Sequence, residues 1–179
     1  FRIPNTFRRL FSEGTFNAAF VPSYSSELVK GEAKSNRFAN EVFNLLFLVL
    51  LALVLVVQIF MPIFVSLIAP GFIDDHEKMN IAINLTRITF PFLLLVSLAS
   101  FFSAILNSHN RFAEAAAAPI ILNIILITIL FFAKLFGDKL VYILSFGVTF
   151  AGFIQLLFLF FFVKKYFKLE LILKFKISN

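Results

Sequence analysis

The sequence predicts an all-α membrane protein, a polytopic membrane helix bundle of about five membrane helices. Of its 179 residues 60% are hydrophobic, and its mean hydropathy is +0.95, whereas soluble domains have about 45–50% apolar residues. The apolar residues are gathered in four long blocks that short polar segments separate. Each block is long enough to cross roughly 30 Å of hydrocarbon as a helix. Membrane strands are not expected, because they would need strict alternation of polar and apolar residues.

Residues 1–27 precede these blocks and differ from them, because aromatic and charged residues are mixed there. On a helix of 3.6 residues per turn, the polar residues of its first half fall on one side and the apolar residues on the other. The polar side forms a cationic stripe of Arg2, Asn5, Arg8, Arg9, Ser12 and Glu13. We therefore expect an amphipathic membrane helix over 1–27, followed by a cytoplasmic loop over 28–42.

Residues 43–164 are expected to form a four-helix transmembrane bundle. The four apolar blocks cover approximately residues 43–69, 81–106, 113–136 and 140–163. Pro62 and Pro91 lie inside the first two blocks and should kink their helices, because proline lacks a backbone N–H. Small residues such as Gly147 and Gly152 allow neighbouring helices to approach closely. The alternative explanation is that small residues are common in all membrane helices.

The distribution of lysine and arginine predicts the orientation. Short connections make consecutive helices antiparallel neighbours, so residues 28–42, residues 107–111 and the tail share one side. These segments carry three, one and five basic residues, against three on the opposite side. Because basic residues concentrate in cytoplasmic loops, the richer side should be cytoplasmic. The basic tail over 165–179 is then cytoplasmic as well.

Composition and motifs exclude several classes of protein. The net charge of +6 is explained by the basic loops, so nucleic acid is not an expected partner. The chain has no cysteine, which excludes disulfides, thiolate metal sites and a cysteine nucleophile. No common catalytic motif or phosphate loop occurs in the sequence. We expect neither an enzyme nor a cofactor or metal.

The cationic stripe is the strongest indication of a functional site. An arginine in a membrane span costs a few kcal/mol or more unless it faces water, an opposite charge or the bundle interior. One interpretation is a hydrated cavity for an anionic substrate, because the guanidinium groups of Arg8 and Arg9 can each bind two phosphate oxygens. Glu13 lies four residues after Arg9 and could pair with it. The alternative is an interfacial helix whose arginines contact lipid headgroups.

Other polar residues have simpler explanations. Arg87, inside the second block, is expected to extend to the membrane interface, with the mouth of a cavity as the alternative. The acidic residues 74–77 are expected to form a solvated loop, since consecutive loop residues rarely converge on a metal. His109 is expected at the surface. Single polar residues within the spans should form interhelical hydrogen bonds; these are Gln58, Asn84, Asn123 and Gln155.

Several motifs connect the chain with a known family. The segment RIPNTFRRLFSEGTFNAAFVPSY over residues 2–24 resembles the signature segment of the MurJ (MviN) family of lipid II flippases. The motif APGF at 69–72, the run over 88–112 and the AlaPro…LeuAsn pattern around 118–123 are similar to later stretches of that family. The resemblance is collinear and covers nearly the whole chain.

The resemblance implies a function and a set of site residues. Members move lipid II, the undecaprenyl-pyrophosphate-linked peptidoglycan precursor, across the bacterial inner (plasma) membrane by alternating access. They have two lobes around a cationic cavity, and this chain is similar to part of the first lobe. The family's cavity arginine falls on Arg8, its carboxylate on Glu13 and its asparagine on Asn5, with Arg9 and Arg2 ranked below them. The implied partners are lipid II, membrane lipids and the remainder of the same polypeptide.

Two other functions remain open at this point. The chain could belong to an exporter of another polysaccharide-lipid or a drug in the same superfamily. It could also be a non-transport membrane scaffold whose amphipathic helix binds anionic lipid. The spacing RR-x-F-x-EG favours the lipid II flippase, and burial of the stripe would separate a cavity from a scaffold.

Overall fold

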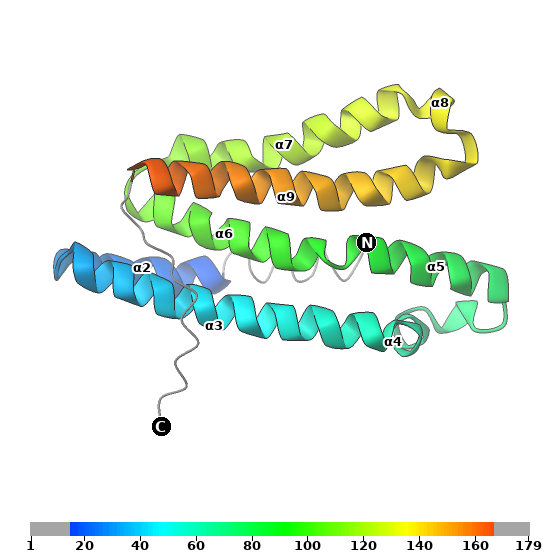
Figure 1. The fold of residues 1–179 in the computed structure, drawn as a ribbon, viewed down its shortest axis with the longest axis horizontal. Helices are drawn as coiled ribbons and strands as arrows, with labels where there is room; N and C mark the ends of the chain where they lie inside the picture. The colour runs from blue at the N-terminus through cyan, green and yellow to red at the C-terminus, as the bar shows by residue number, and fades with distance from the viewer. Residues whose placement is uncertain (1–14, 167–179) are drawn as a thin grey trace.

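The computed structural model describes residues 15–166, and every regular element among them is a helix (Figure 1). The all-α prediction is thereby confirmed. The elements are α2 (Thr15–Val29), α3 (Glu32–Ile59), α4 (Met61–Ile68), η1 (Pro70–Phe72), α5 (His76–Thr89), α6 (Phe92–Ser108), α7 (Phe112–Phe131), α8 (Ala133–Phe136), η2 (Gly137–Lys139) and α9 (Leu140–Tyr166). Four segments are long and apolar enough to cross a membrane, and each overlaps one of the four apolar blocks: Glu32–Ile59, His76–Ser108, Phe112–Phe131 and Leu140–Tyr166.

The spans run antiparallel, so that the helix ends gather at two ends of the bundle. One end holds the α2–α3 turn, the α6–α7 turn and the end of α9 (Figure 1). Contacts confirm this grouping, because Tyr24 on α2 reaches His109 after α6 and Arg111 lies over the ring of Tyr166. The predicted segments over 28–42 and 107–111 therefore share one end with the end of α9, and we call this the basic end.

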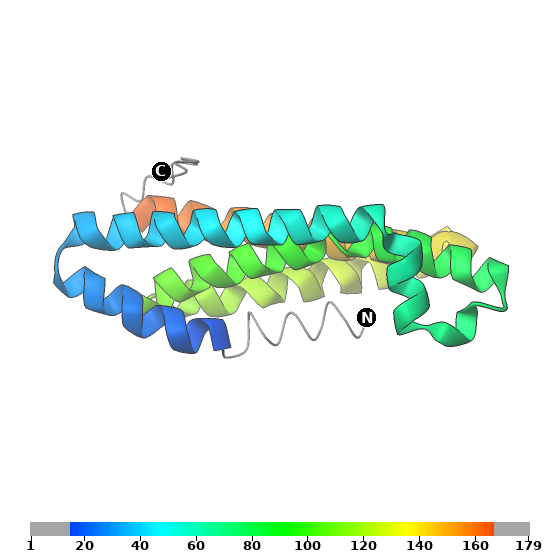
Figure 2. The ribbon, with the colours of Figure 1, turned by 90° about the horizontal axis from the view of Figure 1, so that it is seen from below.

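The connection between α2 and α3 is much shorter than the predicted loop over 28–42. Helix α3 begins at Glu32, and Figure 2 shows the two helices meeting in a tight turn. Gly31 has φ +118°, a conformation that glycine adopts without strain. The polar residues after it continue the helix beyond the apolar block, where Arg37 pairs with Glu41 at 2.9 Å across one helical turn. The prediction of a loop over 28–42 was wrong, because it rested on the polarity of these residues alone.

Both predicted proline kinks are confirmed, because each coincides with an interruption of the regular helix. The first span breaks at Phe60, between α3 and α4, and Pro62 lies in the first turn of α4. The second span breaks between α5 and α6, where Pro91 precedes the first residue of α6. Each proline leaves the carbonyl four residues earlier without its helical donor. The chain resumes as a new helix because proline is tolerated in a first turn.

Helix α6 is the centre of the bundle. Twelve of its 17 residues are buried, against two of the 20 residues of α7. It contacts α2, α3, α7 and α9. Helix α7 instead exposes isoleucines along its length, at Ile120, Ile124 and Ile127. An apolar surface of this kind suits lipid or another hydrophobic segment.

Two glycines allow α9 to approach its neighbours closely. A Cβ atom on Gly152 would lie 2.5 Å from Cδ2 of Phe92 on α6, and a Cβ atom on Gly147 would overlap the side chain of Ile129 on α7. Both glycines are buried. The predicted role of small residues in close helix approach is therefore confirmed at these two positions.

We predict that Gly152→Ala destabilises the bundle by about 1–3 kcal/mol, because overpacking outweighs the gain in helix propensity. Gly71→Ala is the matched control, since a Cβ atom there meets nothing within 4 Å; its effect should stay within about 0.5 kcal/mol. Thermal unfolding of the purified protein in detergent measures both. Equal stability of the two variants would contradict the close contact between α9 and α6.

Candidate functional site

The five residues predicted to bind substrate lie outside the described residues 15–166; they are Arg2, Asn5, Arg8, Arg9 and Glu13. Their roles stay predictions. The predicted helix over 1–27 extends into the described part of the chain as α2, Thr15–Val29. The packing of α2 therefore provides the structural context for the stripe.

One face of α2 is held in the bundle by an aromatic ladder. Phe16, Phe20 and Tyr24 follow one another at a spacing of four residues, and their rings stack with centroids 5.3 and 5.4 Å apart. The ring of Phe20 also lies 5.2 Å from Phe101 on α6 and 5.9 Å from Phe38 on α3. Such offset contacts are favourable beyond their buried area. They fix which side of α2 faces the bundle.

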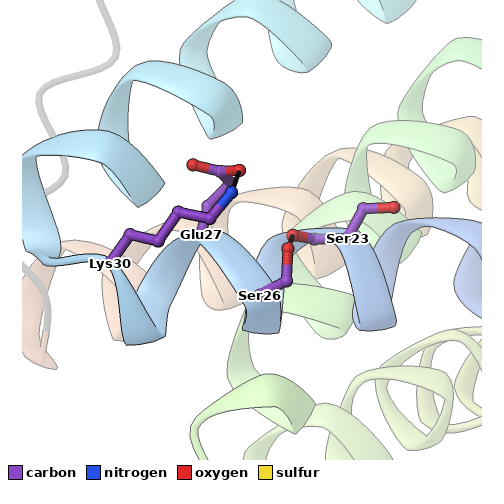
Figure 3. A network of polar contacts seen from close by, with 4 residues as sticks. All are labelled: Ser23, Ser26, Glu27 and Lys30. Atoms are coloured by element: carbon purple, nitrogen blue, oxygen red, sulfur yellow. Dashed lines mark hydrogen bonds and ion pairs between the residues drawn. The ribbon is translucent and has the colours of Figure 1, made fainter.

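The opposite face of α2 carries small residues. It exposes Ala18, Ala19, Pro22, Ser23 and Ser26, with Val29 at the end of the helix. The Ser23 hydroxyl donates to the carbonyl of Ala19 at 2.9 Å, and the Ser26 hydroxyl donates to the carbonyl of Ser23 at 3.0 Å; both serines are labelled in Figure 3. This surface lacks the row of isoleucines that α7 exposes. Between residues 18 and 26 it therefore offers lipid tails less apolar area than α7 does.

A polar cavity lies at the basic end, where α2 and α3 meet the end of α6. Tyr24, only 1% exposed, has its hydroxyl 3.1 Å from Nε2 of His109. The cavity has a volume of about 290 Å³. Its lining comes from α2, α3, α9 and the α6–α7 turn: Tyr24, Leu28, Glu32, Ser35, Asn36, His109 and Tyr166. No sequence pattern predicted this cavity, because its lining residues come from separate elements.

His109 was wrongly predicted to be a simple surface residue. It is half-buried, and its ring lies against Tyr24 at 5.8 Å in an edge-on arrangement. Burial lowers the pKa of His109 below its usual value of 6.5, and the charge of Glu32 opposes this shift. The neutral ring can accept a hydrogen bond from the Tyr24 hydroxyl. Tyr24 and His109 are 85 positions apart, so no local pattern in a single sequence predicts their hydrogen bond.

At the break between α5 and α6, side chains from other helices donate hydrogen bonds to backbone carbonyls. Pro91 lacks the N–H that would bind the carbonyl of Arg87, and Gln58 Nε2 on α3 donates to that oxygen at 2.8 Å. Thr149 Oγ1 on α9 donates to the carbonyl of Ile88 at 2.6 Å. The predicted interhelical hydrogen bond of Gln58 is thereby confirmed. That of Thr149 was not predicted, because a threonine in an apolar block looks unremarkable.

The remaining predicted positions lie apart from this cavity. The side chain of Arg87 is exposed on α5. Within residues 74–77, Asp75 caps α5 by accepting from the backbone N–H of Lys78 at 3.1 Å, so the acidic segment begins a helix. Among residues 15–166, no group of three His, Asp or Glu side chains could hold a metal ion.

The sequence match decides the family. The family model described as "Lipid II flippase MurJ" matches residues 1–178, which include the cationic stripe. The chain belongs to the MurJ family. It is 47% identical over 161 residues to the probable lipid II flippase MurJ of Rhizobium tropici, covering 87% of this chain and 30% of that protein. It is 40% identical over 167 residues to the MurJ protein of Rickettsia prowazekii, covering 92% and 32%.

A solved structure has the same fold. The structure titled "Lipid II flippase MurJ, inward closed conformation" superposes with a TM-score of 0.76 at 28% identity. The match covers 97% of this chain and 35% of that structure. The chain thus spans about a third of the length of the MurJ proteins that it resembles. The lipid II flippase named in these comparisons is a membrane transporter, in agreement with four membrane-spanning segments.

We predict that His109→Gln reduces the loss of stability at acidic pH. Because the pKa of His109 is lowered in the folded state, the unfolded chain binds more protons below about pH 6.5, so stability falls as pH decreases through this range. His76, the other histidine of the chain, is exposed, and His76→Gln should leave the pH dependence unchanged. Thermal unfolding between about pH 5 and 8 checks this. An unchanged slope for His109→Gln would contradict the assigned burial.

We predict that Gln58→Leu destabilises the protein by about 0.6–1.7 kcal/mol, because the carbonyl of Arg87 loses its donor. Thr128→Val is the control, since the Thr128 hydroxyl donates only within its own helix, to Ile124 at 2.8 Å. Its effect should be smaller. Thermal unfolding in detergent compares the two variants, and equal losses would show that the carbonyl does not depend on Gln58.

Proposed function

We propose that the protein is a lipid II flippase of the bacterial inner membrane and that α2 forms part of the wall of its transport cavity. The observation that carries the proposal is the outward face of α2, which between residues 18 and 26 carries small residues and two serines and lacks the bulky apolar side chains that α7 exposes. The family membership supports the same cargo, since the proteins matched are named for lipid II. Because the chain spans about a third of those proteins, the rest of the cavity would come from further segments of the polypeptide.

Helical spacing indicates how the residues of the predicted cationic stripe are aligned with the exposed face of α2. Residues 18 positions apart are separated by five full turns of an α-helix, so a helix continued upstream from α2 places Arg8 in line with Ser26. By the same spacing Asn5 lies in line with Ser23, whereas Arg2 lies in line with Phe20 of the aromatic ladder. Arg8 and Asn5 would then continue the exposed face of α2, and Arg2 would lie on the side of the bundle. The alignment of Arg8 with an exposed position of α2 supports a cavity wall.

The chemistry of the cargo explains the residue types. A lipid-linked pyrophosphate is an anion that must cross a region of low dielectric constant, where an unpaired charge is very costly. The guanidinium groups of Arg8, Arg9 and Arg2 would replace its water by paired hydrogen bonds. Asn5 and Glu13 would complete the polar surface, with Glu13 available to neutralise Arg9 when no substrate is bound.

The proposed orientation places the basic end in the cytoplasm. The lipid-linked cargo would then reach the cavity from the cytoplasmic leaflet, and alternating access between two lobes would release it on the other side. An exporter of another polysaccharide-lipid or a drug is the alternative that shares this architecture. A scaffold that binds anionic lipid is the alternative without transport, and it would leave the leaflet distribution of lipid II unchanged.

Substitution of Arg8 tests the proposal. In the full-length protein, Arg8→Ala should lower flippase activity by at least about tenfold, since a hydrogen bond to a charged group contributes about 1.5–3 kcal/mol. Arg8→Lys should retain part of the activity, because lysine keeps the charge and loses the planar fork. Complementation of flippase depletion and the leaflet distribution of lipid II measure the effect.

Arg37→Ala is the matched control, because Arg37 is an exposed arginine that pairs with Glu41 on α3. It should complement fully. Wild-type activity of both Arg8 variants would remove the proposed role of Arg8 in binding phosphate. Normal lipid II distribution after depletion of the protein would favour the scaffold.

A further inference from the structure

Among residues 15–166, the lining of the cavity at the basic end includes one charged side chain, that of Glu32. The described walls around it are otherwise aromatic, apolar or uncharged polar, with Tyr24 and His109 on one side and Tyr166 from the end of α9. Glu32 therefore lines the same cavity as the rings of Tyr24 and His109. The described lining is acidic, although the segments around it are basic.

Glu32 differs from the two carboxylates nearest to it in the sequence. Glu27 on α2 binds Lys30 at 2.6 Å, as labelled in Figure 3, and Glu41 binds Arg37 at 2.9 Å on α3. No lysine or arginine between residues 15 and 166 forms an ion pair with Glu32. Glu32, which lines the cavity, therefore has no cation from the described part of the chain.

The lining suits a primary ammonium group. An ammonium ion has three N–H donors, and the Glu32 carboxylate in the cavity lining accepts hydrogen bonds. Aromatic rings add attraction for cations, and the Tyr166 ring already has the Arg111 guanidinium 4.2 Å from its centroid. Arg111 thereby places a positive group at the edge of an acidic cavity. A ligand with an ammonium and a neighbouring phosphate would match both charges.

The position of the cavity selects a lipid as the source of this group. Helix α3 has 28 residues, about 42 Å at 1.5 Å per residue, which exceeds the hydrocarbon thickness of roughly 30 Å. Glu32 lies in the first turn of α3, and the cavity also meets the ends of α2, α6 and α9. The cavity thus lies where a membrane-spanning bundle meets lipid headgroups. Its volume of about 290 Å³ holds about ten waters at roughly 30 Å³ each, which is far too small for a disaccharide-peptide.

We propose that this cavity binds the headgroup of phosphatidylethanolamine, with the ammonium against Glu32 and the phosphate toward Arg111. The proposal does not depend on the proposed transport of lipid II, and it concerns a site at the opposite end of α2 from the cationic stripe. The bound lipid would connect α3 and α9 at the basic end. Phosphatidylcholine would bind weakly, because its quaternary ammonium is larger and has no N–H to donate.

The first experiment uses the full-length wild-type protein. It is purified in detergent, freed of endogenous lipid and offered phosphatidylethanolamine, its N-methyl and N,N-dimethyl derivatives and phosphatidylcholine, all with the same acyl chains. Native mass spectrometry measures the bound fraction at equal concentration. We expect binding to fall with each methyl group, by about tenfold over the series. Equal occupancy across the series would overturn the proposal.

The second experiment compares two carboxylate variants. Glu32→Gln should abolish the preference for phosphatidylethanolamine over phosphatidylcholine, whereas Glu41→Gln should retain it, since Glu41 is engaged with Arg37. Thermal unfolding without lipid checks that both variants are folded. A retained preference in Glu32→Gln, or an equal loss in both variants, would overturn the assignment to this cavity. Flippase activity is not the readout, so failure of this proposal is distinguishable from failure of the proposed function.

Discussion

Two backbone carbonyls at the break between α5 and α6 determine how the spans meet. Inside a membrane an unsatisfied carbonyl costs several kcal/mol, so a helix can break there only where other groups supply the missing donors. Gln58 on α3 and Thr149 on α9 supply them to Arg87 and Ile88. The break therefore fixes the register of α3 and α9 against the same point of the central span.

The close contacts of α9 follow from this arrangement. Thr149 lies between Gly147 and Gly152, two positions where α9 approaches α7 and α6 closely. The hydroxyl of Thr149 reaches the carbonyl of Ile88 because the backbones are near each other, and the glycines allow that distance. The hydrogen bond and the small residues are thus parts of one contact. A larger residue at Gly147 or Gly152 would push α9 away from α7 or α6. The Thr149 hydroxyl would then lie farther from the carbonyl of Ile88.

The sequence predicted the features that depend on local composition or on covalent chemistry. The four spans follow from block length, the breaks follow from Pro62 and Pro91, and the shared basic end follows from antiparallel connections. The predicted loop over 28–42 was too long, because polar residues such as Arg37 and Glu41 can extend a helix beyond the membrane. The pairing of Tyr24 with His109 could not be predicted, since it depends on how α2 packs against the end of α6. The stripe over residues 2–13 lies outside the described residues and stays a prediction.

The attachment of α2 limits the ways in which the proposed transport can occur. The aromatic ladder from Phe16 to Tyr24 binds α2 to α3 and α6, and the hydroxyl of Tyr24 adds a hydrogen bond to His109 at the basic end. These contacts lie along one face, so α2 cannot rotate or slide without exposing several buried rings. A helix held in this way moves together with the rest of the bundle. Under the proposed function, access to the cationic stripe would therefore change by movement of the whole bundle against the remaining segments of the polypeptide, rather than by movement of α2 within it.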